Sequence, residues 1–326
     1  MKNLYKQYGG LKREIYVLFI GRMVTNMGSM VWPVLTLIMT QKMGMSASQA
    51  SILNILAGFV MLPAGLIGGK VADRFNKKVC IIVCDIISVI FYIACGIIPL
   101  SGISVALMIT AATFQMVEHP AYSALIADLT QTKDRERAYS LSYLGANLGL
   151  IASPTIAGLL FVNHLWLSFI ISGVGIGMST ILIFFLVKDI TPVKDDEKEV
   201  GKYQQVREDV SIRKILSENR IVLLYLLIWG LYSAAYRQYN FLMPIDLSDI
   251  HGEAGAMIFG TVTSLNCIVV VIFTPLFTNI FKKMHQTWKS VLGEVFLFTG
   301  LVIFLIFLGH IWLTILPRLY LPSVRS

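Results

Sequence analysis

Long apolar stretches recur throughout this chain, and they limit what it can fold into more than any other feature. A helix needs roughly 20 mostly apolar residues to cross the hydrocarbon core of a bilayer. With 56% hydrophobic and only 14% charged residues, the chain has more apolar surface than one water-soluble core can bury. The sequence therefore predicts an all-α, polytopic bundle of transmembrane helices whose first partner is the lipid bilayer. Nine stretches stand out: residues 15–39, 51–69, 79–100, 103–126, 138–161, 165–187, 221–243, 255–281 and 291–308.

Basic residues predict the orientation of these stretches, because cytoplasmic loops collect lysine and arginine. They lie at the N-terminus and in every second loop, whereas the opposite loops hold only Lys42. This alternation predicts a cytoplasmic N-terminus in a multi-pass protein of the cell membrane, of the bacterial plasma-membrane type. It also accounts for the net charge of +8, so we expect no nucleic-acid partner. The first stretch is too long for a signal peptide, and we expect it to remain as the first span.

No motif for an enzyme or a cofactor is visible. The cysteines lie within apolar stretches and lack the spacing of metal ligands. The chain has no phosphate-binding loop, nucleophile elbow or dinucleotide fingerprint. We therefore expect no catalytic residues, no metal, no cofactor and no use of ATP. The four cysteines are Cys80, Cys84, Cys95 and Cys267.

A charged segment also divides the chain into two apolar parts. Residues 1–187 form a six-helix transmembrane half, and residues 188–220 form a charged cytoplasmic linker. Residues 221–326 form an incomplete second half with about three helices. They end in a tail with Pro317, Arg318, Pro322 and Arg325, which cannot continue as a helix in lipid.

The loop after the second stretch carries a family resemblance. From Gly69 it reads GKVADRFNKK, which resembles the signature G-x-x-x-D-R-x-G-R-K of the major facilitator superfamily, at the place where that family carries it. We expect Gly69 to let the two helices approach, and Asn76, in place of a glycine, to accept a left-handed backbone. A solvated, positively charged loop would explain the same residues. The matching residues are Gly69, Asp73, Arg74, Lys77 and Lys78.

The fifth stretch carries a second resemblance. Gly145, Gly149, Pro154 and Gly158 resemble a degenerate form of the exporters' motif G-x-x-x-G-P-x-x-G-G, although close helix packing in lipid would also select small residues there. Residues 120–129 and the start of the fifth stretch are similar to those of drug and metabolite exporters. The exporters' arginine motif is not recognisable, since residues 103–126 contain no arginine.

The resemblance implies a monomeric, ion-gradient-driven exporter of small molecules of the multidrug or metabolite type, an antiporter with protons or sodium as the coupling ion. Family members have twelve helices in two halves, of which this chain has about nine. The resemblance also implies that Asp73 engages helix eleven, which the sequence does not contain. We therefore expect a C-terminally truncated, poorly active carrier. The alternative is a non-functional fragment or a membrane sensor that does not transport.

Charged residues inside the stretches are candidates for mechanism, because burying charge in a membrane is expensive. Arg22, Asp85 and Glu118 fall at similar depths in the first, third and fourth stretches. We hypothesise that Arg22 pairs with one of the two carboxylates and that the pair couples to transport. A structural ion pair, or snorkelling of Arg22, is the alternative.

Four more residues are candidates for the cavity. Asn26 and Trp32 lie on the first stretch, which lines the central cavity in the family. Arg237 lies beside Tyr236, and a cation among aromatic rings would suit an anionic or planar substrate. An interfacial aromatic belt has the same composition. His119 is expected to be a hydrogen-bonded core residue, with a proton relay as the alternative.

Overall fold

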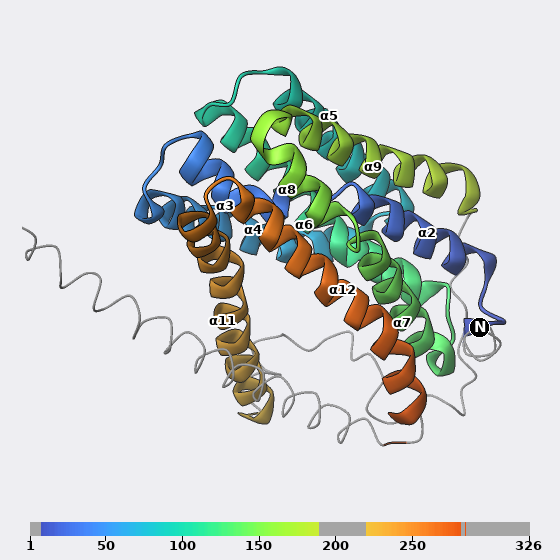
Figure 1. Cartoon of the computed structure of the whole chain (residues 1–326). Coiled ribbons are helices and arrows are strands. Elements are labelled where there is room, and N and C mark those ends of the chain that lie inside the picture. Colours follow the sequence, from blue (N-terminus) through green and yellow to red (C-terminus); the bar gives the residue numbers. More distant parts are fainter. Residues whose placement is uncertain (1–7, 189–219, 282–283, 285–326) are drawn as a thin grey trace, which may run out of the picture. The chain divides into compact units, whose positions relative to one another are not determined.

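The computed structural model describes residues 8–188, 220–281 and 284. Within them every regular element is a helix (Figure 1), as the apolar stretches predict. The helices are α2 (Arg13–Met27), α3 (Val31–Leu37), the short π-helix η1 (Ile38–Lys42), α4 (Ala47–Arg74), α5 (Lys77–Ile97), α6 (Gly102–Asp128), α7 (Thr132–Gly149), α8 (Ser153–Asn163), α9 (Leu165–Leu186), α11 (Arg220–His251) and α12 (Ala254–Ile280).

Polar caps fix where two of the long helices begin. Before α4, the Ser46 hydroxyl accepts a hydrogen bond from the Gln49 N–H, and the Gln49 side chain accepts one from the Ser46 N–H. Before α5, the Asn76 side chain accepts hydrogen bonds from the N–H groups of Lys78 and Val79. These bonds satisfy backbone donors that a helix start leaves unpaired. The reversal between α4 and α5 therefore takes only two residues.

The first and fifth apolar stretches are each interrupted. The first consists of α2 and α3, separated by Gly28, Ser29 and Met30, and the fifth consists of α7 and α8, separated by residues 150–152. A proline follows each interruption within the first turn of the next helix, Pro33 in α3 and Pro154 in α8. Proline has no N–H and cannot continue the hydrogen bonding of the preceding turn. Each interruption therefore coincides with a missing backbone donor.

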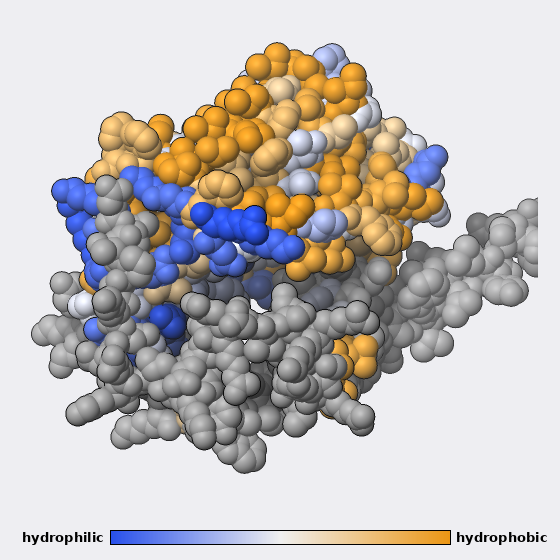
Figure 2. Space-filling model, turned by 180° about the vertical axis from the view of Figure 1, so that it is seen from behind, coloured by the Kyte–Doolittle hydropathy of each residue, from blue (hydrophilic) through white to orange (hydrophobic). Residues whose placement is uncertain are grey.

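Within the described residues, six helical segments are long and apolar enough to cross a membrane. Helices α6 and α11 are not among them; α6 carries Gln115, Glu118 and His119 near its middle. The outward face of α4 is strongly apolar, with Phe59 71% exposed. Figure 2 shows a broad hydrophobic surface with hydrophilic residues gathered in a band along one edge. Apolar exposure on this scale fits lipid. The six segments are Arg13–Lys42, Ala47–Arg74, Lys77–Ile97, Thr132–Asn163, Leu165–Leu186 and Ala254–Phe277.

The chain divides into two units. The first comprises Met1–Gln205 and Met243–Asn279, and the second comprises Val206–Leu242 and Ile280–Ser326. Two buried apolar clusters hold the first unit together, one around Leu125 and one around Val34. The predicted linker lies almost entirely outside the described residues, as do the ninth stretch and the tail.

Candidate functional site

Two carboxylates are buried in the first unit. Asp85 on α5 is 8% exposed and Glu118 on α6 is 6% exposed. Each lies close enough to Arg22 on α2, and the two lie close enough to each other, to interact electrostatically. The three charged residues that the sequence placed at similar depth therefore form one cluster. Buried charge of this kind is costly unless it is compensated.

Arg22 contacts an aromatic ring instead of a carboxylate. Its guanidinium carbon lies 4.0 Å from the centroid of the Tyr122 ring, in a cation–π arrangement. Tyr122 is itself buried, and its hydroxyl donates a hydrogen bond to the Leu18 carbonyl one turn before Arg22. Among the described residues no ion pair joins Arg22 to Asp85 or Glu118. The hypothesised pair is thus not formed in this structure, although the groups are gathered.

The two carboxylates have different surroundings. The Thr180 hydroxyl, on α9, donates a hydrogen bond of 2.8 Å to Asp85 Oδ2 and lies 2.9 Å from the Ile176 carbonyl of its own helix. Within the described part of the chain, Glu118 has neither a hydrogen-bond donor nor an ion-pair partner. Asp85 is therefore held in place between α5 and α9, whereas Glu118 is free to bind a proton or a cation.

The signature loop differs from what we expected of it. Asn76 has φ −60° and ψ 117°, so it does not adopt a left-handed backbone, and its role is to cap α5. Gly69 lies within α4, and a Cβ there would meet no atom within 4 Å, so it does not mediate a close approach of helices. Asp73 and Arg74 are exposed. The expectations for Gly69 and Asn76 were wrong because α4 runs on as a regular helix to Arg74.

The two lysines of the signature do make contacts. Lys77 Nζ lies 2.7 Å from Asp128 Oδ2, which joins the start of α5 to the end of α6. Lys78 Nζ donates hydrogen bonds of 2.9 and 2.6 Å to the carbonyls of Phe184 and Val187 at the end of α9. A cation at a helix C-terminus pairs with unpaired carbonyls and with the helix dipole. These lysines therefore hold three helix ends together.

The small-residue motif packs against two different helices. A Cβ at Gly149 would lie 2.8 Å from Asn26 Cβ and 2.9 Å from the Met27 nitrogen, so α7 lies directly against α2. Gly145 lies against Phe19 in the same interface. Small residues permit such close approach in lipid.

Beyond the interruption, the same motif meets α12. A Cβ at Gly158 would lie 2.6 Å from Met257 Cα, and Gly260 lies against Pro154. The Thr155 and Ser264 hydroxyls share a hydrogen bond of 2.9 Å across this interface.

The structure describes the side chains of two of the four cavity candidates, Asn26 and Trp32. Asn26 is half-buried and donates a hydrogen bond to the Arg22 carbonyl, and Trp32 is 42% exposed beside the buried Tyr92. The side chains of Tyr236 and Arg237 lie outside the described residues. His119 is exposed, which contradicts its assignment to the core. The sequence carried no signal that Tyr122 and Thr180 would contact the charged residues.

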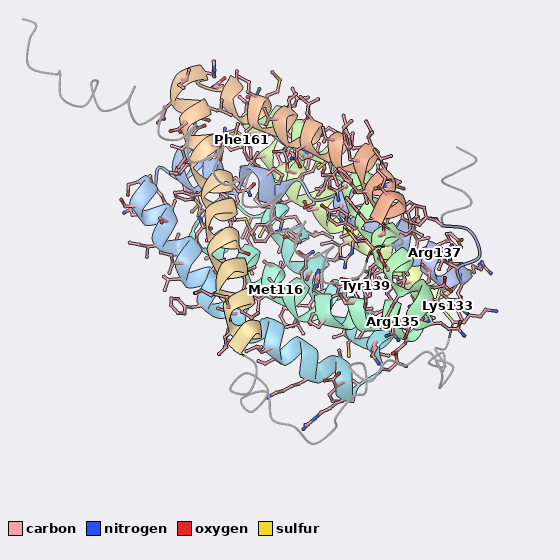
Figure 3. All side chains as sticks on the ribbon, turned by 90° about the horizontal axis from the view of Figure 1, so that it is seen from below. Met116, Lys133, Arg135, Arg137, Tyr139 and Phe161 are labelled. Atoms are coloured by element: carbon pink, nitrogen blue, oxygen red, sulfur yellow. The ribbon has the colours of Figure 1, made fainter. Side chains whose placement is uncertain are left out.

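A basic residue, Arg137, also holds the opening turn of α7 in place. Arg137 pairs with Asp134 at 2.7 Å and donates a hydrogen bond of 2.6 Å to the Gly9 carbonyl. Figure 3 shows Lys133, Arg135 and Arg137 gathered at one end of α7, with Tyr139 one turn further along. The Tyr139 hydroxyl donates to the Ser123 carbonyl of α6 at 2.9 Å.

Curated relatives are distant. An uncharacterized MFS-type transporter, YqjV of Bacillus subtilis, is 24% identical over 290 residues, which are 87% of this chain and 68% of that protein. A Na(+), Li(+), K(+)/H(+) antiporter of Planococcus maritimus is 22% identical, with coverages of 89% and 72%. Multidrug resistance protein MdtH of Salmonella typhimurium is 24% identical, with coverages of 74% and 58%. The chain therefore spans between about three fifths and three quarters of these relatives.

A solved structure shows the same fold. A bacterial homolog to the human lysosomal transporter Spinster, in an inward-facing and unoccupied conformation, superposes with a TM-score of 0.64 at 17% identity. The superposition covers 85% of this chain and 65% of that one. Residues 17–322 match the Major Facilitator Superfamily. This chain is therefore a multi-pass membrane protein of the Major Facilitator Superfamily, a family of transporters and not of enzymes.

Proposed function

We propose that this secondary transporter is a proton-coupled antiporter that exports small cationic or amphipathic molecules. The observation that carries the proposal is the cluster that two buried carboxylates, Asp85 and Glu118, form with the half-buried Arg22. With both carboxylates ionised, one guanidinium leaves the cluster with a net negative charge in a low-dielectric interior. A proton on one carboxylate, or a cation beside it, balances that charge.

Glu118 is the proposed exchange group. Asp85 is held by Thr180, whereas Glu118 has no hydrogen-bond donor and no ion-pair partner among the described residues. When Glu118 loses its proton, its carboxylate attracts Arg22 away from the Tyr122 ring. Because Arg22 lies on α2, which ends at an interruption six residues later, this attraction pulls on the half-helix and not on the whole span. Protonation of Glu118 releases Arg22 to the ring again.

Two kinds of cargo are compatible with this cycle. The name of the MdtH relatives supports an organic compound, and the name of the Planococcus relative supports an alkali cation exchanged for a proton. We favour the organic cation as cargo because the fourth and fifth apolar stretches resemble those of exporters. Alkali-cation exchange is the second candidate.

The proposal is tested in proteoliposomes of the whole chain with an internal pH dye. We expect an imposed proton gradient to drive uptake of ethidium or tetraphenylphosphonium, and these probes to drive proton movement in return. Glu118→Gln should abolish both. The matched control is Glu253→Gln, at an exposed position between α11 and α12, which should transport like the unaltered chain. Equal coupling in Glu118→Gln would refute the role of Glu118, and no flux in the unaltered chain would favour a sensor or an inactive fragment.

A further inference from the structure

The two interrupted spans are interrupted at the same level. Gly149, the last residue of α7, lies against Met27, the last residue of α2, with only 2.9 Å between the Met27 nitrogen and a Cβ placed at Gly149. Beyond the interruptions, Ala157 of α8 is buried in the same apolar cluster as Val31 and Val34 of α3. The half-helices therefore pack in pairs, and the two gaps lie side by side.

Proline leaves a carbonyl without its donor in each gap. In a continuous helix the Ser29 carbonyl would accept from residue 33 and the Leu150 carbonyl from residue 154, but both positions are proline. In the part of the chain that the structure describes, neither carbonyl accepts another hydrogen bond. Backbone carbonyls of membrane-spanning segments are normally paired, so these two are available to a ligand.

Three side-chain oxygens accompany them. Asn26 and Asn147 each donate an amide hydrogen to the carbonyl four residues earlier, at 2.8 and 2.9 Å, which leaves each Oδ1 as an acceptor. Ser153 begins α8 and is 1% exposed, yet its hydroxyl has no hydrogen-bond partner among the described residues. Ser153 lies one turn before Ala157 and so shares its side of α8, and Ala157 belongs to the buried cluster that includes Val31 and Val34.

The chemistry of these oxygen atoms selects a cation as the ligand. Helices α2 and α7 both end here with a partial negative charge of about half an electron each, which the N-termini of α3 and α8 beyond the gaps offset in part. The proposed ligand set is entirely of neutral oxygens, which suits a hard monovalent cation, whereas a divalent ion would call for carboxylates. Half-helix ends and unwound carbonyls bind sodium in other transporters built from broken helices.

We propose that the paired gaps form a binding site for a monovalent metal cation such as Na⁺, built from Ser29, Leu150, Asn26, Asn147 and Ser153. The site goes beyond the proposed function, because it uses neither carboxylate of the charged cluster. It assigns a ligand to a buried hydroxyl and two carbonyls that the antiport cycle leaves unused.

The test is direct binding of radioactive sodium to the purified whole chain in detergent. We expect saturable binding that lithium or potassium displaces. Ser153→Ala should weaken it by about tenfold, as expected for the loss of one oxygen ligand. Pro154→Ala should weaken it as well, because alanine restores an N–H that occupies the Leu150 carbonyl. Pro63→Ala in α4 and Pro120→Ala in α6 are matched controls that remove a proline elsewhere, and they should bind like the unaltered chain.

Glu118→Gln separates this site from the proposed function. We expect it to abolish proton coupling and to leave sodium binding unchanged. The proposal is overturned if the unaltered chain binds no sodium, or if both Ser153→Ala and Pro154→Ala, eluting as the same single species on size exclusion, bind with unaltered affinity. Loss of binding in Glu118→Gln would also overturn it, by placing the cation at the carboxylates.

Discussion

The Thr180 hydroxyl on α9 donates a hydrogen bond of 2.8 Å to the Asp85 carboxylate on α5. Both side chains are buried, at 6% and 8% exposure. The bond holds one of the two interior carboxylates to a neighbouring helix and so distinguishes it from Glu118.

Removal of the Thr180 hydroxyl should destabilise the protein. Thr180→Val keeps the shape of the side chain but leaves a buried acceptor unsatisfied, which costs about 1–3 kcal/mol. Thermal unfolding of the purified chain should show a lower midpoint. Thr110→Val is the control, since Thr110 is on α6 and bonds only to the Ala106 carbonyl of its own helix, in an exposed setting. Equal midpoints for the two variants would show that the Asp85 bond contributes nothing.

The Tyr122 ring, more than its hydroxyl, should matter for Arg22. Tyr122→Phe keeps the ring beneath the guanidinium and loses the bond to the Leu18 carbonyl, whereas Tyr122→Leu loses both. A cation–π contact in a desolvated place is worth about 2 kcal/mol. We expect proton-coupled flux to persist in Tyr122→Phe and to fall strongly in Tyr122→Leu. Equal loss in the two variants would assign the role to the hydroxyl.

Two glycines of the family motifs should respond in opposite ways to alanine. A Cβ at Gly149 would meet α2 at 2.8–2.9 Å, so Gly149→Ala should force α7 and α2 apart and lower the yield of folded protein. A Cβ at Gly69 meets nothing within 4 Å. Gly69→Ala should therefore stabilise α4 by about 0.5–1 kcal/mol, through helix propensity. Size-exclusion profiles and unfolding midpoints measure both, and a folded, stable Gly149→Ala would contradict the contact.

Lys78, which caps the end of α9, should contribute more to the stability of the protein than the exposed Lys70. Lys78 donates to two carbonyls at the end of α9, whereas Lys70, on α4, is exposed. Lys78→Met removes the cap and should lower the unfolding midpoint by an amount equivalent to about 1 kcal/mol. Lys70→Met should have no measurable effect. The prediction is wrong if the two variants unfold together.

The long helices could be predicted from the sequence because lipid imposes a length on any spanning segment. The charged cluster was also accessible, since Arg22, Asp85 and Glu118 are conspicuous in apolar surroundings. The two helix interruptions could not be predicted from the sequence, because a proline alone does not show whether a helix breaks next to it. Pro63 and Pro120 lie inside continuous helices, whereas Pro33 and Pro154 follow breaks, and the difference depends on tertiary packing.

Contact partners were the part that sequence reasoning could not supply. Opposite charges suggested that Arg22 would pair with a carboxylate, but its position over the Tyr122 ring depends on how α2 and α6 pack. The signature loop suggested a left-handed Asn76, but a side chain that caps α5 satisfies two backbone donors instead. In both cases the residue type allowed several contacts, and the surrounding helices selected one.

The most direct measurement of the central claim is proton release from the detergent-purified chain in weakly buffered solution. On addition of tetraphenylphosphonium, the unaltered chain should release protons into the medium, because a cation in the site displaces the proton from Glu118. Glu118→Gln should release none, and Glu253→Gln should release as many as the unaltered chain. Proton release that persists undiminished in Glu118→Gln would contradict the account.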